Sequence, residues 1–178
     1  DVYKRQGLIF DHEIDSIQNV TVAAGFTREI SENANKTAYY SNAYALGLAY
    51  NFVHTTYGLD FAHKDTKNKD GAGNKVKNNE VTAVIRQGLN EDWNVYAMYS
   101  YKTEKTLPVG SAYSKSTDRQ FLVGTEYYVY NQGSLKVKPF LEWQATRTKY
   151  ENTFDKDSGK QLDRSRDFKT VIGLRAYW

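Results

Sequence analysis

The fold class is decided by the stretch Trp93-Asn94-Val95-Tyr96-Ala97-Met98-Tyr99-Ser100-Tyr101-Lys102. Every second position on one side of this stretch is apolar or aromatic. The apolar set is Trp93, Val95, Ala97, Tyr99 and Tyr101. A period of two is that of a β-strand, whereas one face of a helix returns every 3.6 residues. The stretch therefore predicts a strand with one apolar face.

The same alternation recurs along most of the chain. The segments that show it are Leu8–Asp15, Val20–Thr27, Tyr39–Tyr50, Val53–Ala62, Val81–Leu89, Trp93–Lys102, Val123–Val129, Leu135–Ala145 and Phe168–Trp178. Most run for about ten residues, against about five or six for an ordinary strand. A strand tilted by about 45° needs about 9–11 residues to cross a bilayer. We predict an all-β, antiparallel, up-and-down transmembrane β-barrel with about nine strands in this sequence.

The connections between these segments alternate in length. Tight turns are expected at Ser16–Asn19, Asn51–Phe52, Asn90–Asp92 and Asn131–Ser134. Longer polar loops are expected at Ser31–Thr37, Thr66–Lys77, Thr106–Thr117 and Glu151–Arg164. Short turns at one end and long loops at the other are typical of outer-membrane barrels. Pro139 is the one residue that speaks against a closed barrel, because a proline inside a strand normally needs an edge or a bulge.

Composition excludes several functional classes. Lys and Arg number 24 and Asp and Glu 21, so a net charge of +3 gives no sign of nucleic-acid binding. The absence of Cys excludes disulfides and thiolate metal sites. No run of about eighteen apolar residues exists to form a membrane helix. Aromatic residues nevertheless reach 15%, with 15 Tyr, which suits side chains at a water–hydrocarbon boundary.

Alternation alone does not separate a soluble sandwich from a membrane barrel, because both have one apolar face. Three features favour the barrel. The other face is rich in Gly, Ala and Ser, as restricted interior space requires, and the chain ends on an aromatic residue. Aromatic residues also gather near strand ends, as in the two girdles of a membrane barrel. The expected girdle residues are Tyr40, Phe61 and Tyr101 near the long loops, and Tyr50, Trp93 and Trp178 near the short turns.

The ending Val171-Ile172-Gly173-Leu174-Arg175-Ala176-Tyr177-Trp178 resembles the terminal strand of Gram-negative outer-membrane barrels. Those strands commonly close on Phe or Trp, although Ala176 stands where an aromatic residue is common. The resemblance implies a bacterial outer-membrane location and recognition of this strand by the barrel-insertion machinery. With Val137–Glu142, the pattern is most similar to the small monomeric porins. These are the channels specific for oligogalacturonate or sialic acid, which have about twelve strands, or the larger monomeric general porin. A monomer is therefore expected.

Residues 1–6, Asp1-Val2-Tyr3-Lys4-Arg5-Gln6, resemble the translation of a sequencing-library adaptor. We expect residues 7–178 to be a single barrel domain that lacks its N-terminal strands. The alternative is that residues 1–6 begin a native strand. Because a single-chain bacterial barrel has an even strand number, ten to fourteen strands are expected in total, with twelve favoured by the resemblance.

Charged residues on the non-apolar face are expected to line the pore. The candidate pore-lining residues are Asp60, Arg86, Lys102, Glu126, Lys136, Lys138, Glu142 and Arg175. Fixed charges in a water-filled pore would guide solutes, which predicts a porin for passive diffusion of small hydrophilic solutes, oligosaccharides among them. The alternatives are internal ion pairs that plug a narrow barrel, and a non-conducting barrel that serves adhesion or surface structure through its long loops. Outer-membrane lipid and lipopolysaccharide are the expected surroundings.

The sequence shows no established catalytic or metal-binding pattern, and we expect neither enzymatic activity nor a cofactor. Its three His residues form no metal motif. His63 with Asp65 is the best candidate for a catalytic pair, and a solvated strand end is the simpler interpretation. Asp155–Gly159 lacks the Gly and Glu of a calcium loop. Lys67, Lys69, Lys75 and Lys77 could hold lipopolysaccharide phosphates, but a solvated loop is an equal alternative.

Overall fold

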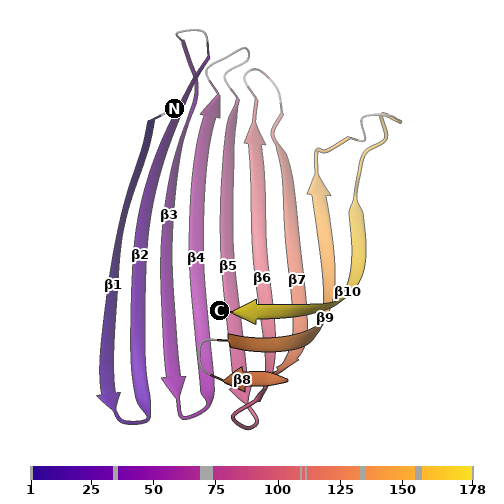
Figure 1. Ribbon diagram of the computed structural model, residues 1–178. Coiled ribbons are helices and arrows are strands. Elements are labelled where there is room, and N and C mark those ends of the chain that lie inside the picture. The colour runs from indigo at the N-terminus through magenta and orange to yellow at the C-terminus, as the bar shows by residue number, and fades with distance from the viewer. Residues whose placement is uncertain are drawn as a thin grey trace.

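The computed structural model describes residues 2–33, 36–68, 74–108, 110, 112–132, 135–154 and 158–177. These residues form one antiparallel sheet and contain no helix (Figure 1). Its strands are β1 (Val2–Asp15), β2 (Gln18–Asn33), β3 (Lys36–Phe52), β4 (Thr55–Asn68), β5 (Lys75–Gly88), β6 (Trp93–Leu107), β7 (Ser114–Tyr127), β8 (Tyr130–Gln132), β9 (Leu135–Glu151) and β10 (Arg164–Tyr177).

Each strand pairs with the next one along the chain, in the order β1-β2-β3-β4-β5-β6-β7-β9-β10. The short β8 lies off this path and pairs with β9, on the same side as β7. β7 and β8 are therefore two parts of one interrupted strand. The prediction of an all-β, up-and-down arrangement with about nine antiparallel strands is confirmed.

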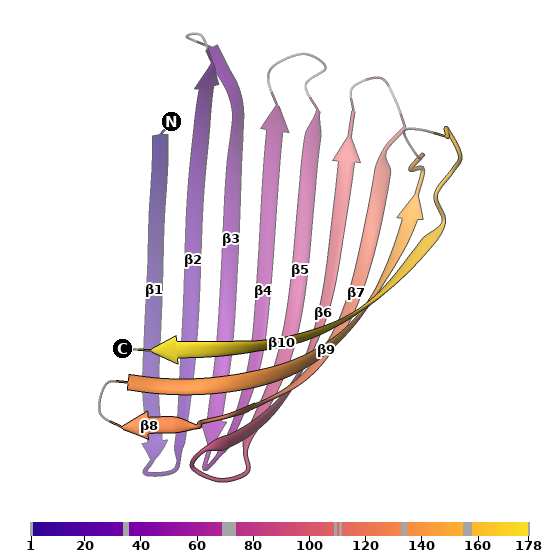
Figure 2. The same cartoon turned by 45° about the vertical axis from the view of Figure 1, so that its right-hand side comes forward.

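The sheet is strongly curved and twisted. In Figure 2 the C-terminal strands β9 and β10 bend away from the direction of β1–β5 and cross in front of them. The described parts of β1 and β10 are not paired, so the sheet is open and has two free edges. A curled, all-antiparallel sheet of this kind is consistent with a barrel.

The strands are longer than the apolar pattern predicts. They extend into the expected polar loops. The described residues of Ser31–Thr37 belong to β2 and β3, and the loop expected at Thr106–Thr117 begins only at Pro108. Segments such as Ser114–Arg119 carry no apolar alternation, yet they continue the hydrogen-bonded ladder. Backbone pairing needs no apolar side chain, and this is why the prediction ended these strands too early.

The short turns also differ in detail from expectation. Asn51 and Phe52 belong to β3, and the turn lies at Val53–His54, where Val53 has a φ of 54°. Val53 N–H donates to the Ile17 carbonyl at 2.9 Å, which ties this turn to its neighbour. Asp15 caps the first turn, because its Oδ1 accepts from the Ile17 N–H at 2.9 Å.

Pro139 is accommodated by the interruption between β7 and β8. Val129 N–H donates to the Val137 carbonyl at 3.0 Å, so alternate residues of β9, Pro139 among them, direct their backbone groups toward β7 and β8. Opposite Pro139 the chain is not in strand conformation, at Tyr128–Val129. Its missing N–H therefore falls where no ladder partner is available, and the continuous strand expected over Val123–Val129 is instead broken.

The two faces of the sheet have opposite character. Cross-strand partners share a face, and the register joins Leu48 to Leu59 and Val123 to Trp143 on the apolar face. These apolar side chains are exposed: Leu59 is 49% and Leu141 46% accessible. Buried polar residues of the opposite face include Ser41, Ser100, Glu126 and Lys138. Because side chains crowd on the concave side of a curved sheet, we call this opposite, polar face the inner face.

Most of the aliphatic residues on the apolar face are exposed. Leu48, Leu59, Leu141 and Leu174 are exposed. Val95 lies on the same face by register but is half-buried. The Trp93 indole reaches Thr125, the cross-strand partner of Val95, so a large ring lies next to it. No second sheet covers the apolar face within the described residues, contrary to what a soluble sandwich requires.

Candidate functional site: an ion-pair cluster on the inner face

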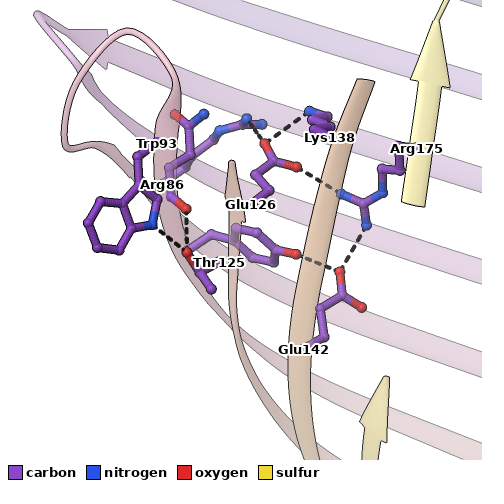
Figure 3. A network of polar contacts seen from close by, with 9 residues as sticks. Arg86, Trp93, Thr125, Glu126, Lys138, Glu142 and Arg175 are labelled. Atoms are coloured by element: carbon purple, nitrogen blue, oxygen red, sulfur yellow. Dashed lines mark hydrogen bonds and ion pairs between the residues drawn. The ribbon is translucent and has the colours of Figure 1, made fainter. Parts of the chain in front are cut away.

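Five of the predicted pore-lining residues meet on the inner face, near the short-turn end of the sheet (Figure 3). They come from four strands that are separate in sequence. Arg86 lies near the end of β5 and Glu126 near the end of β7, while β9 contributes Lys138 and Glu142 and β10 contributes Arg175. We call these five residues the ion-pair cluster.

Glu126 lies at the centre of the cluster and is only 2% exposed. Its Oε1 accepts from Arg86 and lies 3.0 Å from Lys138 Nζ, and its Oε2 accepts from Arg175 Nη1 at 3.0 Å. Burying a carboxylate is costly unless cations and hydrogen bonds replace its water. Three cations around one carboxylate provide that replacement.

Arg175 connects Glu126 to the second carboxylate. Its Nη2 donates to Glu142 Oε1 at 2.9 Å, and the Tyr96 hydroxyl donates to the same oxygen at 2.6 Å. The guanidinium thus spans two carboxylates with two separate N–H groups, which only arginine among the cationic side chains can do with fixed geometry. Tyr96 was not among the predicted site residues. The period-two pattern, which places Tyr96 on the same face as Asn94 and Met98, is the only sequence signal that could have indicated its position in the site.

Aromatic rings surround the cations. Lys138 Nζ lies 5.0 Å from the ring centre of Tyr128 and 5.2 Å from that of Tyr177, and the side chain is almost fully buried. The guanidinium of Arg175 lies 4.2 Å from the ring centre of Phe140. Contacts of a cation with an aromatic face partly replace lost hydration. These contacts hold the side chains of Lys138 and Arg175 against the inner face.

Two glycines make room for the rings. Gly124 lies opposite Tyr96 and Gly173 lies opposite Phe140 in the register. A Cβ on Gly124 would lie 2.5 Å from the Tyr96 Cζ, and one on Gly173 would overlap the Phe140 ring. These two glycines of the inner face therefore allow the neighbouring aromatic rings to lie flat against the sheet.

The cluster presents its positive charge to the inner space. The cations outnumber the carboxylates by one. The side chains of Arg86 and Arg175 are 42% and 38% exposed, whereas that of Glu126 is 1% exposed. A solute close to the inner face would therefore contact guanidinium groups before it contacted carboxylates. The cluster is therefore an electropositive surface built over buried negative charge.

The other three predicted pore-lining residues lie outside the cluster. Asp60 is exposed and lies opposite Gly47 in the middle of the sheet. Lys102 is exposed, between Glu80 and Asp118 in the cross-strand register. Lys136 is exposed and lies opposite Tyr177.

A further polar group on the inner face was missed by the sequence analysis. Ser100 Oγ donates to Glu80 Oε1 at 3.2 Å, and Thr82 Oγ1 donates to Ser100 Oγ at 3.3 Å. Small hydroxyl residues give no charge pattern, although the inward period-two positions of Thr82 and Ser100 indicate their face. This group adds a hydrogen-bonding surface of two hydroxyls and one carboxylate to the inner face.

The predicted girdle residues lie on the apolar face. Trp93 is exposed and donates through Nε1 to Thr125 Oγ1 at 2.7 Å, and Tyr50 donates to Gln18 at 2.8 Å while its ring stacks on that of Tyr57. Phe61 of β4 and Tyr101 of β6 lie on the apolar face where it gives way to polar residues toward the long loops. Tyr40 lies nearer the loop end, opposite Lys67. Trp178 lies outside the described residues.

The remaining sequence candidates are only partly described. His63 Nε2 lies 3.3 Å from Asp65 Oδ2, and Lys75 Nζ lies 3.7 Å from Asp65 Oδ1. Among the described residues, no Ser or Thr hydroxyl is hydrogen-bonded to His63, so this pair has no adjacent nucleophile. Lys69, and residues 155–157 of the calcium-like segment, lie outside the described residues. The described residues contain no group of three His, Asp or Glu side chains that could hold a metal ion.

Comparisons with known proteins add no assignment. No protein family, no curated protein and no solved structure matches the chain. Within the described residues, no helix is long and apolar enough to cross a membrane.

Proposed function

We propose that this chain forms the wall of a bacterial outer-membrane porin, a water-filled channel for passive diffusion of small hydrophilic solutes, oligosaccharides among them. One observation carries the proposal: the apolar side chains of the sheet are exposed, while Glu126 and Lys138 on the other face are buried. A protein surrounded by water places these residue types the other way round. The distribution suits a wall with hydrocarbon outside and water inside.

Strand length and edge composition support the same proposal. The strands of the continuous sheet have 14 to 17 residues, which exceeds the length needed to cross a bilayer at a tilt. Every interior strand of the path β1–β7, β9 and β10 pairs on both sides, which satisfies most of the backbone polar groups that lipid cannot satisfy. Exposed Trp93 and Tyr127 near the short turns are suited to a membrane interface.

The mechanism is passage along a charged wall, and no bond is made or broken. Water and the inner-face hydroxyl and charged groups replace part of a solute's hydration. The exposed guanidinium groups of Arg86 and Arg175 favour anions and acidic solutes at the short-turn end, since the carboxylates beneath them are covered. The ion-pair cluster stabilises the inner face and makes its exposed charge positive.

Planar-bilayer recording tests the proposal. We expect stepwise single-channel currents and a reversal potential displaced toward anions in a salt gradient. Arg86→Gln should reduce the anion preference, because it removes an exposed cation of the inner face. Arg119→Gln removes the same charge from the apolar face and should leave selectivity unchanged. Inserted protein without conductance would contradict the channel and favour the non-conducting barrel with adhesive or structural loops.

The proposed partners follow from this placement. They are outer-membrane lipid, lipopolysaccharide, the transported solutes, and the insertion machinery that would read the C-terminal strand β10. We propose a monomer, in line with the small porins that the sequence resembles.

A further inference from the structure

The apolar face carries an unusual row of arginines at its long-loop end. Arg119 of β7, Arg147 of β9 and Arg166 of β10 are direct cross-strand partners. The next row toward the loops adds Lys149 and Arg164, which are also opposite each other. We call these five residues the cationic patch.

Like charges placed directly opposite each other in a sheet are destabilising. The described carboxylates relieve only part of the repulsion. Glu151 lies 3.9 Å from Lys149, and Asp163 lies 3.4 Å from Arg164. Among the described residues, no carboxylate lies within ion-pair distance of Arg119, Arg147 or Arg166. The arginine row therefore lacks the counter-charge that such an arrangement requires.

The patch is hollowed and partly lined by neutral groups. A depression of about 360 Å³ is bordered by the cations Arg119, Arg147, Lys149, Arg164 and Lys115, and by Thr117, Tyr101 and Glu151. Its one carboxylate, Glu151, lies 3.7 Å from Lys115 Nζ, so cations remain in excess around the hollow. The guanidinium of Arg119 lies 6.0 Å from the centre of the Tyr101 ring. Several guanidinium groups around one hollow can donate paired hydrogen bonds to the oxygens of a phosphate group.

Apolar surface begins directly below the arginine row. The next row consists of Phe121, Ala145 and Phe168, and Phe168 is 66% exposed. Two residues along a strand correspond to about 7 Å. A ligand of this surface must therefore combine anionic groups with apolar chains at that separation.

We propose that the cationic patch binds the phosphate groups of a phosphorylated glycolipid of lipid A chemistry, whose acyl chains lie on Phe121 and Phe168. This inference rests on the proposed membrane location. It also relocates the lipopolysaccharide contact expected at Lys67–Lys77, because Lys75 there is already paired with Asp65 at 3.7 Å. The described cations of that region have a carboxylate among them, whereas the arginine row has none.

Titration of the protein with lipid A, in nanodiscs of a zwitterionic phospholipid, tests this assignment. The double variant Arg119→Gln/Arg147→Gln should bind lipid A at least about tenfold more weakly, because two charge-assisted contacts are lost. Dephosphorylated lipid A should bind the unaltered protein equally weakly. Lys67→Gln/Lys77→Gln is the matched control: it removes two charges from the same face and end, and it should bind as the unaltered protein does.

Two further measurements separate the outcomes. Inorganic phosphate at millimolar concentration should not displace lipid A, and displacement would assign the patch to free phosphate instead. Equal affinity of the arginine variant and the control would overturn the inference. Arg119→Lys/Arg147→Lys keeps both charges and should retain part of the affinity, which controls for misfolding. Conductance of the same variants in lipid A-free bilayers reports on the channel proposal independently.

Discussion

Gly124 lies directly beneath the aromatic ring of Tyr96, its cross-strand partner on the inner face. The arrangement holds the Tyr96 hydroxyl 2.6 Å from Glu142, which in turn receives Arg175. The absence of a side chain in β7 is therefore a condition for the hydrogen bonds that link β6 to β9 and β10.

Gly124→Ala should disrupt this arrangement. The added methyl group would lie 2.5 Å from the Tyr96 Cζ, so the ring must move and its bond to Glu142 is strained or lost. We expect a loss of about 1–3 kcal/mol in unfolding free energy, measured by denaturant titration. Gly58→Ala is the control, since its Cβ would meet only Val84, at 3.6 Å. Equal stability of the two variants would contradict the packing account.

Glu126→Gln should destabilise the wall more than Glu142→Gln does. Glu126 is buried among three cations, whereas Glu142 faces only one. Removal of one partner from a buried ion pair costs about 3–5 kcal/mol, because the remaining charges lose their compensation. Unfolding by denaturant checks the order of the two variants. The same Glu126 variant should increase anion preference in reversal-potential measurements.

Pro139→Ala should change stability by less than about 1 kcal/mol. The new N–H would point toward the interruption at Tyr128–Val129, where no ladder partner is lost or gained. Leu141→Pro removes an N–H from the same side of β9, two residues on, where Thr125 of β7 is its partner. This second variant should unfold at clearly lower denaturant concentration. A large loss for Pro139→Ala would instead show that the ring has a packing role.

Leu141→Arg should hinder folding into lipid. Leu141 is exposed on the apolar face, and an arginine at the bilayer midplane costs about 2–4 kcal/mol. Gln144→Arg makes the matched change on the inner face of the same strand and should be tolerated. Folding yield into vesicles, followed by protease protection, compares the two. Equal yields would place Leu141 in water and contradict the membrane orientation.

The alternation of residues such as Leu59 and Asp60 was sufficient to predict the strands and both faces. It also placed Arg86, Glu126, Lys138, Glu142 and Arg175 on one face. Their convergence on Glu126 depends on register, which pairs Glu126 with Phe140 and places Arg175 beside Lys138. Register follows from turn positions, and the prediction misplaced the turn at Val53–His54.

The cationic patch escaped prediction for a related reason. Arg119, Arg147 and Arg166 are far apart in sequence, and each lies between an expected strand and an expected loop, so it was assigned to neither. Only the pairing of β7, β9 and β10 makes them neighbours. The presence of strands before Val2 and the origin of residues 1–6 stay predictions, although Val2–Gln6 does continue β1 and pairs with β2.

Cysteine accessibility is the most direct test of the central claim that the inner face lines a water-filled channel. The chain has no Cys, so single substitutions report without background. Leu59→Cys and Asp60→Cys place neighbouring thiols on opposite faces of β4. A bulky, water-soluble thiosulfonate should reduce the current through Asp60→Cys channels in a planar bilayer and leave Leu59→Cys channels unchanged. Equal modification of both positions, or inserted protein that carries no current, would contradict the account.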